Sequence, residues 1–183
     1  MLYNYKDKKP DISRALFIAP SADITGDVVL AESVSVWHQA TLRADLEPVI
    51  IDSGTNVQEQ CALHVDHGAP VKVGRMVTLG HGVILHGCTV EDGCMIGMGA
   101  TVLNNAVIGR ESIVGAGALI TEGKQFPPRS LILGSPARAV KTVSDQAVDR
   151  VRKNSELYIQ LARDMGSAAG KNYSAGGDNE TGN

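Results

Sequence analysis

The sequence predicts an all-β solenoid, in which short strands wind into a β-helix of hexapeptide repeats, followed by one α-helix. Three observations favour this fold class. An aliphatic residue recurs at every sixth position over most of the chain, 20 of the 183 residues are glycine, and aromatic residues make up only 4% of the composition. A period of six is neither the 3.6 of an amphipathic helix nor the 2 of a simple strand. It is typical of a β-helix in which each six residues form one strand and one corner.

The aliphatic positions fall into a few runs, each with a constant spacing of six. They are Ile18, Ile24, Leu30, Val36 and Leu42, then Ile51, Val57 and Leu63, then Val73, Leu79 and Leu85, and then Val90, Ile96, Val102, Ile108, Val114 and Ile120. We expect these side chains to point into the solenoid, with the glycine that often follows them allowing a tight corner. The alternative is a β-sandwich in which aliphatic residues alternate by chance. The small number of registers, four for all these positions, disfavours it.

Three breaks in the register interrupt the repeat. Three residues are inserted in 42–51, four are inserted in 63–73, and one is missing in 85–90. Insertions in a solenoid become loops on its surface, and such loops often lie at the functional face. We therefore expect surface loops at the two insertions.

Composition and charge exclude several classes of partner. The net charge is −3 and no basic block stands out, so we expect no nucleic acid partner. Residues 1–12 lack the apolar segment of a signal peptide, and no apolar run is long enough to span a bilayer. Cys61, Cys88 and Cys94 lack Cys-x-x-Cys spacing and are interpreted as small buried residues in a reducing compartment. We expect a cytoplasmic protein without a membrane partner.

Five motifs in fixed order carry a resemblance to a known family. They are LRADLEPVII, TNVQEQCALHVD, LGHGVILHGC, GMGATVL and LILGSPAR. In these motifs residues 12–140 resemble the γ-class carbonic anhydrases. The resemblance implies a left-handed parallel β-helix with three hexapeptides per coil, a C-terminal helix packed against it, and a homotrimer. It also implies zinc sites whose three histidines come from two subunits, at the positions of His64, His81 and His86.

The repeat arithmetic agrees with this division of the histidines, once three strands per coil are granted. His64 and His86 each follow an inward leucine and lie 22 residues apart, or 18 without the four inserted residues, which is three hexads. They should then sit one above the other on strands about 4.8 Å apart, close enough to share an ion. His81 lies one hexad earlier, so we expect it on a different face, pointing away from the pair. In a threefold ring a neighbour's His81 would meet the pair. The alternative is that these histidines only bond backbone carbonyls at corners.

Polar residues near the histidines extend the expected site. Counting hexads places Arg43 in the column of the two paired histidines, with Asp45 two residues later. The resemblance implies that Arg43 and Asp45 form an ion pair that bridges to the neighbouring subunit, and the alternative is a surface ion pair of well under ~1 kcal/mol.

The resemblance also gives roles to three further residues. It implies that Gln58 hydrogen-bonds the zinc-bound water and that Asn56 orients Gln58. The alternative is that both only satisfy backbone groups at their corner. Tyr158 matches a tyrosine found near the zinc in relatives, and the alternative is that it merely packs against the solenoid.

The implied reaction is the reversible hydration of CO2 to bicarbonate. Three neutral imidazoles leave Zn²⁺ an open position for water, whose pKa falls to about 7, so that hydroxide forms at neutral pH; Fe²⁺ or Co²⁺ could replace zinc. The most active relatives carry a glutamate directly after the Arg-x-Asp motif and an acidic loop after the first zinc histidine. This chain has Leu46 and HVDHGAP there, so low activity is an expectation.

Two other functions stay open for a hexapeptide β-helix. One is a CoA-dependent acyltransferase, and the other is a non-enzymatic metal-binding or scaffold trimer. The closing LGSPAR does not discriminate, because it also occurs in acyltransferases. The three-histidine register does, because an acyltransferase needs only one histidine as general base.

The chain beyond the repeats predicts a helix and a tail. Residues 1–140 form the β-helix with an N-terminal extension, and 141–165 form a helix packed on it. Ser144 can cap this helix, Asp145 lies in its first turn, and its apolar face should contact the solenoid. Residues 166–183 are rich in glycine and small polar residues, which predicts a disordered tail.

Overall fold

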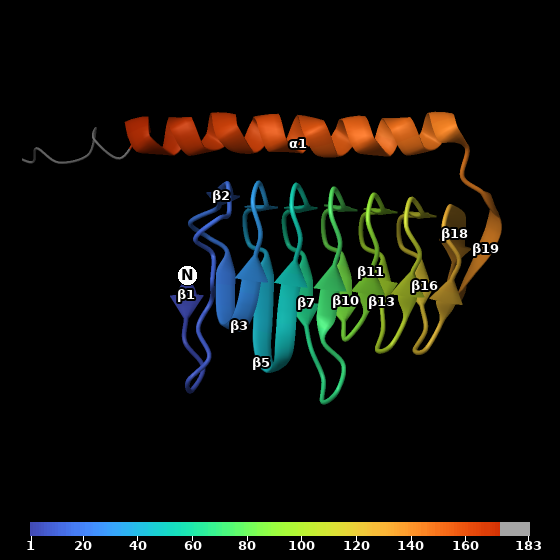
Figure 1. The fold of residues 1–183 in the computed structure, drawn as a ribbon, viewed down its shortest axis with the longest axis horizontal. Coiled ribbons are helices and arrows are strands. Elements are labelled where there is room, and N and C mark those ends of the chain that lie inside the picture. Colours follow the sequence, from blue (N-terminus) through green and yellow to red (C-terminus); the bar gives the residue numbers. More distant parts are fainter. Residues whose placement is uncertain (173–183) are drawn as a thin grey trace, which may run out of the picture.

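The computed structural model describes the backbone of residues 1–172 and the side chains of residues 1–166. The chain folds into a left-handed parallel β-helix with a single helix, α1 (Asp145–Asn172), lying along one side (Figure 1). The predicted fold class is therefore confirmed. No helix within the described residues is long and apolar enough to cross a membrane.

The strands stack in three columns, which form the three faces of a prism. Face 1 holds β2 (Phe17–Ile18), β4 (Ser35–Val36), β6 (Asn56–Val57), β9 (Thr78–Leu79), β12 (Met95–Ile96), β15 (Ile113–Val114) and β18 (Ser130–Gly134), closed by the antiparallel β19 (Ala137–Thr142). Face 2 holds β7 (Ala62–His64), β10 (Ile84–His86), β13 (Thr101–Val102) and β16 (Leu119–Ile120). Face 3 holds β8 (Val71–Val73), β11 (Thr89–Val90), β14 (Val107–Ile108) and β17 (Gln125–Phe126).

Two long strands join faces 2 and 3 at the N-terminal end of the solenoid. They are β3 (Asp23–Leu30) and β5 (Thr41–Ile51), which pair with each other, while β1 (Leu2–Tyr3) pairs with the free edge of β3. The first residues of β5 pair with β7 and its last residues pair with β8. The chain therefore bends from one face to the next without leaving the β conformation.

The hexad positions form the core. All of them except the partly buried Ile18 are buried. On face 2, Leu42, Leu63 and Leu85 are register partners on successive strands, so the aliphatic side chains stack in columns. Burying each such side chain stabilises the fold by roughly 1.5–3 kcal/mol.

The three cysteines lie in the same core as free thiols, as predicted. Burial raises the pKa of the Cys61 thiol to about 11, and it raises the pKa values of Cys88 and Cys94 to about 12. The protonated thiols are therefore poor nucleophiles and poor metal ligands at neutral pH.

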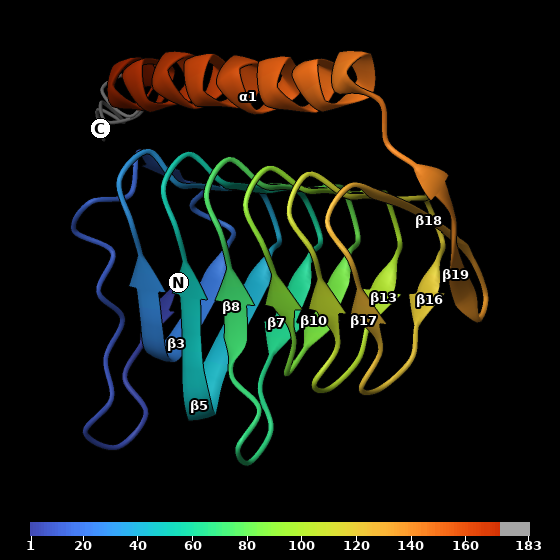
Figure 2. The same cartoon turned by 45° about the vertical axis from the view of Figure 1, so that its right-hand side comes forward.

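The two insertions behave differently. The insertion after His64 forms a turn closed by an antiparallel bridge between Asp66 and Ala69, and it projects from the corner between faces 2 and 3 (Figure 2). The prediction of a loop within 42–51 is wrong, because β5 runs through this segment unbroken. Its neighbour β3 follows the same bend and hydrogen-bonds it on both sides of a register shift after Gly26.

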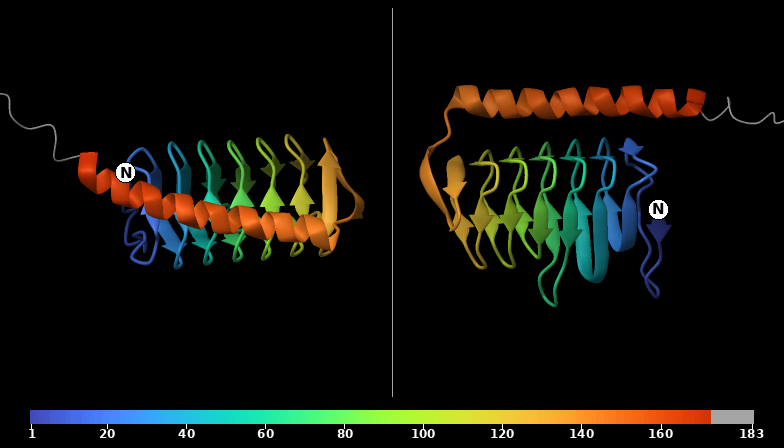
Figure 3. Two further views of the ribbon diagram at one scale, coloured as in Figure 1. Left: turned by 90° about the horizontal axis from the view of Figure 1, so that it is seen from above. Right: turned by 180° about the vertical axis from the view of Figure 1, so that it is seen from behind.

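Helix α1 packs on face 1 against β2, β4, β6 and β9 (Figure 3). At its start, the backbone nitrogen of Ala147 donates to Ser144 Oγ at 3.3 Å, as expected for a cap. The buried line is Val151, Ser155 and Ala162.

The expected helix differs from the observed one in two respects. The helical spacing of apolar residues predicts that Leu161 and Met165 share the packed face, but they are 38% and 37% exposed. The helix also continues beyond residue 165 to Asn172. Residues 173–183 of the expected tail lie outside the described residues.

Gly97→Ala is expected to destabilise the solenoid. A Cβ at this corner would lie 2.5 Å from the backbone nitrogen of Ala116 on the next coil, and such overpacking costs about 1–3 kcal/mol. Urea unfolding at fixed protein concentration measures the loss. Gly123→Asn is the control, because a Cβ there meets no atom within 4 Å and Asn tolerates positive φ. A wild-type midpoint for Gly97→Ala would contradict the expected clash.

Candidate metal centre

Two histidines meet at the corner between faces 2 and 3. His64 ends β7 and His86 ends β10, and they are direct register partners. Their ring centroids are 5.0 Å apart, and His64 Nδ1 lies 3.0 Å from His86 Nε2. The position that the spacing predicted for this pair, one coil apart in the same column, is confirmed.

The remaining nitrogen of each ring faces an acceptor. His64 Nε2 lies 3.1 Å from Asp45 Oδ1, and His86 Nδ1 lies 2.5 Å from Asn104 Oδ1. A carboxylate or amide oxygen only accepts a hydrogen bond, so these two ring nitrogens carry the protons, and a neutral imidazole then has its lone pair on the other nitrogen. Both lone pairs therefore point into the gap between the rings.

Two ring nitrogens 3.0 Å apart need a positive centre between them, which is either a shared proton or a metal ion. Two imidazoles on one tetrahedral zinc, with Zn–N about 2.0–2.1 Å, place their nitrogens about 3.3 Å apart. The observed separation of His64 and His86 is close to this value. The donor set therefore fits a metal ion that accepts imidazole ligands.

Arg43 and Asp45 stand beside the pair. Arg43 is the register partner of His64, so the predicted column is confirmed. It forms an ion pair with Asp45 in the same chain. The pKa of Asp45 lies below its ordinary value. Burial raises it, but the hydrogen bond from His64 and the Arg43 guanidinium together outweigh that effect. Asp45 is thus an ionised acceptor for His64, and its bridge to another subunit stays a prediction.

His81 lies apart from the pair. It belongs to the turn before β10, at the corner between faces 1 and 2, so it occupies the opposite edge of face 2 from His86. Its Nδ1 lies 2.7 Å from Glu59 Oε2, which leaves Nε2 with the lone pair, and its side chain is 46% exposed. Among the side chains of residues 1–166, no three His, Cys, Asp or Glu residues gather to hold a metal ion.

Gln58 and Asn56 lie on the same edge as His81, one coil earlier. The Gln58 amide nitrogen donates to Asn56 Oδ1 at 3.0 Å, and Asn56 Nδ2 donates to Thr78 Oγ1 at 3.0 Å. Asn154 of helix α1 also donates to Thr78, at 3.1 Å. This chain of hydrogen bonds fixes the Gln58 amide with its oxygen left as the acceptor.

Tyr158 of α1 lies on this side of the molecule as well. It packs edge-on against Trp37, with ring centroids 5.6 Å apart. Burial, and then the charge of nearby Glu59, raise the pKa of Tyr158 above its ordinary value. The helix thus brings a tyrosine near the carboxylate that holds His81.

Sequence reasoning missed Asn104. The chain lacks one residue in 85–90, and as a result Val102 is the register partner of Leu85. Asn104 therefore lies one position beyond the column of His86, at the corner. Counting in hexads predicts site residues only within the columns and so did not identify it. The helix residue Asn154 was missed for another reason, because its contact with Thr78 joins segments far apart in sequence.

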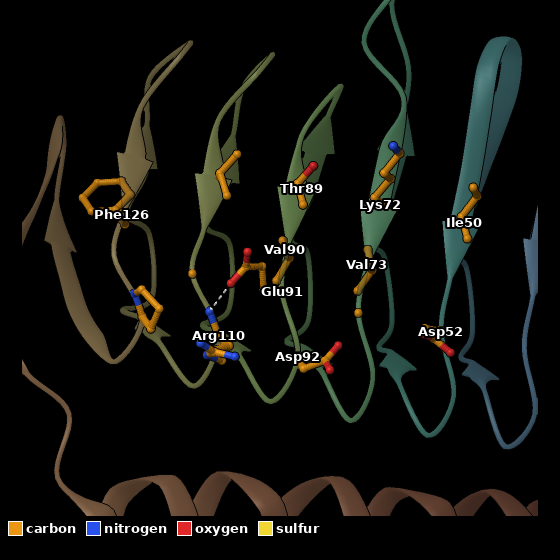
Figure 4. Close-up of a pocket in the computed structure, with 14 residues that line it drawn as sticks. Ile50, Asp52, Lys72, Val73, Thr89, Val90, Glu91, Asp92, Arg110 and Phe126 are labelled. Atoms are coloured by element: carbon orange, nitrogen blue, oxygen red, sulfur yellow. Dashed lines mark hydrogen bonds between the residues drawn. The ribbon is translucent and has the colours of Figure 1, made fainter.

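A separate groove of about 620 Å³ runs along face 3, lined by side chains such as Ile50, Lys72 and Phe126 (Figure 4). None of the predicted site residues lines it. Its charges are mixed, since Lys72 and Arg110 share it with Asp52, Glu91 and Asp92.

Comparison with known proteins places this arrangement in a family. Residues 87–122 match the family model "Bacterial transferase hexapeptide (six repeats)". A protein of Bacillus cereus proposed to be an acetyltransferase has a solved structure that is 35% identical, with a TM-score of 0.87, over 92% of this chain and 98% of that one.

Named carbonic anhydrases match most of the chain. "Gamma carbonic anhydrase 2, mitochondrial" of Arabidopsis thaliana is 34% identical over 94% of this chain, which spans 64% of that protein. The "Probable carbonic anhydrase" of Methanocaldococcus jannaschii is 40% identical over 85% of this chain and 98% of its own length. The chain belongs to the γ-class carbonic anhydrase family.

Proposed function

We propose that the protein catalyses the reversible hydration of CO2 to bicarbonate at metal sites between the subunits of a homotrimer. Each site would take His64 and His86 from one subunit and His81 from the next. The observation that carries the proposal is the approach of His64 Nδ1 and His86 Nε2 to 3.0 Å, while the other nitrogen of each ring faces an acceptor oxygen. Family membership supports the reaction.

The edges of face 2 support the division between subunits. The pair lies at one edge and His81 at the other, so a single chain cannot bring all three to one ion. In a threefold ring the contact between neighbours joins two different edges. A neighbour's His81 would then complete the site, together with the Gln58 on its edge.

The chain's own residues hold the ligands and the reactants. Asp45 accepts a hydrogen bond from His64, and Glu59 accepts one from His81. The other nitrogen of each ring then keeps a lone pair with which it could bind the metal. Zinc, when bound, lowers the pKa of a water molecule and so supplies a nucleophile at neutral pH. Gln58 Oε1 would accept a hydrogen bond from that water and orient it toward CO2, because Asn56 holds the Gln58 amide by its nitrogen.

The three ligands allow more than one metal. Neutral imidazoles suit Zn²⁺ and also Fe²⁺ or Co²⁺, and we propose zinc as the resident ion. The buried free thiols support a reducing compartment, and we propose the cytoplasm.

The proposal is tested on one purified sample by three measurements. We expect light scattering to show a trimer, metal analysis to show about one ion per chain, and stopped-flow assays to show CO2 hydration. A stable monomer with bound metal would contradict the shared site.

The solved Bacillus cereus relative supports a second candidate, a CoA-dependent acyltransferase. Titration calorimetry with acetyl-CoA separates the two activities. We expect no binding, because the face 3 groove sets three carboxylates, Asp52, Glu91 and Asp92, against the two cations Lys72 and Arg110 and so gives no net attraction for phosphates. Binding of acetyl-CoA by a trimer without CO2 hydration would favour the acyltransferase. A metal-loaded trimer with neither property would be a binding protein or scaffold.

A further inference from the structure

We propose that Asn104, held by Asp66, is a positioning residue that sets the tautomer of His86. This inference rests on the proposed metal site. His86 Nδ1 lies 2.5 Å from Asn104 Oδ1, so Nδ1 carries the proton and the Nε2 lone pair faces His64. Without an acceptor at Nδ1, the proton could move to Nε2 and block the lone pair.

The direction of the Asn104 amide is fixed by Asp66. Asn104 Nδ2 donates to Asp66 Oδ2 at 3.0 Å. A carboxylate only accepts, so the nitrogen of the amide must face Asp66 and its oxygen must face His86. If the amide were reversed, its NH2 group would face His86 Nδ1. That arrangement would favour the tautomer in which Nε2, and not Nδ1, carries the proton.

Asp66 is itself held in place by the insertion after His64. Its backbone exchanges hydrogen bonds of 3.1 and 2.9 Å with Ala69, and its Oδ1 accepts from the backbone nitrogen of His67 at 2.8 Å. Oδ2 is then left for Asn104. The insertion that interrupts the repeat after one histidine therefore supplies the support for the other.

Gly87 makes room for the Asn104 side chain. Its φ is +58°, and a Cβ at this position would lie 2.7 Å from Asn104 Oδ1 and 2.8 Å from Ala69 Cβ. The shortened corner after His86 therefore brings the coils close enough for Asn104 to reach the ring. The contact depends on both register breaks, the insertion and the missing residue.

The amide gives His86 a support unlike those of the other two histidines. His64 and His81 each face a carboxylate directly, from Asp45 and Glu59. His86 faces a neutral oxygen, with the carboxylate of Asp66 one hydrogen bond further away. Partners that orient a ligating histidine in this way are typically worth 10–100-fold in metal affinity, about the effect we expect here.

The test uses the full-length trimer and two readouts. Asn104→Leu keeps the approximate size of the side chain but removes the acceptor, and chelator competition is expected to show ~10–100-fold weaker zinc binding. Nitrogen-15 NMR of the histidine rings in the metal-free trimer is expected to show His86 protonated at Nδ1 in the wild type and at Nε2 in a substantial share of Asn104→Leu rings. Gln160→Leu removes an exposed amide that bonds Asp164 on helix α1, away from the histidines, and it should change neither readout.

Asp66 and His67 offer a second pair of variants should Asn104→Leu fail to assemble. Asp66→Leu removes the acceptor of Asn104 and should weaken zinc binding, whereas His67→Ala, in the same turn, keeps the backbone nitrogen that holds Asp66 and should bind zinc nearly as the wild type does. Equal zinc affinity for these two variants, or unchanged affinity and His86 tautomer in Asn104→Leu, would overturn the positioning role. A wild type that binds no zinc would instead defeat the proposed function, and the His86 tautomer would still decide the role of Asn104.

Discussion

Zinc binding is expected to return when chains carrying His81→Ala assemble with chains carrying His86→Ala, although neither variant holds the metal alone. The His81→Ala chain keeps the His64–His86 pair but lacks the histidine that would complete the site of its neighbour. The second keeps His81 and lacks half of the pair. Because two imidazoles hold zinc poorly, each pure trimer should lose most of its metal.

The size of the recovery follows from the ring. A site is complete wherever an intact pair faces an intact His81 across an interface, and a mixed closed ring of three has one such interface. Random assembly of equal amounts should therefore restore about one quarter of the sites. Purification through two different tags retains only mixed trimers, in which one site of three is complete, so metal analysis of these trimers should find about one third of the sites restored.

The matched control mixes His64→Ala with His86→Ala. Both chains have a broken pair and an intact His81, so no interface can be complete and no metal should return. Zinc in this control would mean that two ligands suffice. An absence of recovery in the first mixture, with the trimer intact, would mean that all three ligands lie within one chain.

Much of this site could be predicted from the sequence, because the solenoid converts spacing into position. With a fixed number of residues per coil, 22 residues minus a four-residue insertion places His86 on His64, and the register confirms it. Arg43 followed from the same count. In a fold with irregular connections the same spacing would have predicted nothing.

The contacts that depend on side-chain direction could not be predicted in this way. Asn104 reaches His86 only because the coil between them is one residue short and Gly87 leaves space. Asn154 reaches Thr78 only because α1 returns over face 1. The β5 strand was expected to break, and it does not, because β3 bends with it. Each of these outcomes is set by neighbouring segments rather than by the local repeat.

The region after Asp45 bears on the rate of the proposed reaction. Hydration of CO2 releases a proton, which must reach bulk water before the next turnover. Leu46 lies at the position where the family resemblance predicts a glutamate for fast catalysis, and it is 36% exposed. Its backbone carbonyl accepts a hydrogen bond from Lys8 Nζ at 2.7 Å. A leucine at this position cannot carry a proton.

The CO2 hydration rate is therefore expected to rise with the concentration of small imidazole-type buffers, which carry the proton in place of a side chain. Leu46→Glu should partly remove this dependence by raising the rate at low buffer. Leu46→Gln is the matched control, because it has nearly the same shape but no titrating group, and it should keep the dependence. Stopped-flow assays over a series of buffer concentrations at constant ionic strength measure all three proteins.

Gln58→Ala should have the opposite signature, because it acts on the attacking water rather than on proton release. We expect a rate lower by ~10–100-fold at every buffer concentration, with metal content unchanged. A rate in the wild type that is fast and independent of buffer would mean that another side chain carries the proton. A metal-loaded trimer that hydrates no CO2 even in concentrated buffer would contradict the proposed reaction itself. The buffer would then be carrying the proton, so slow proton release could no longer explain the missing activity.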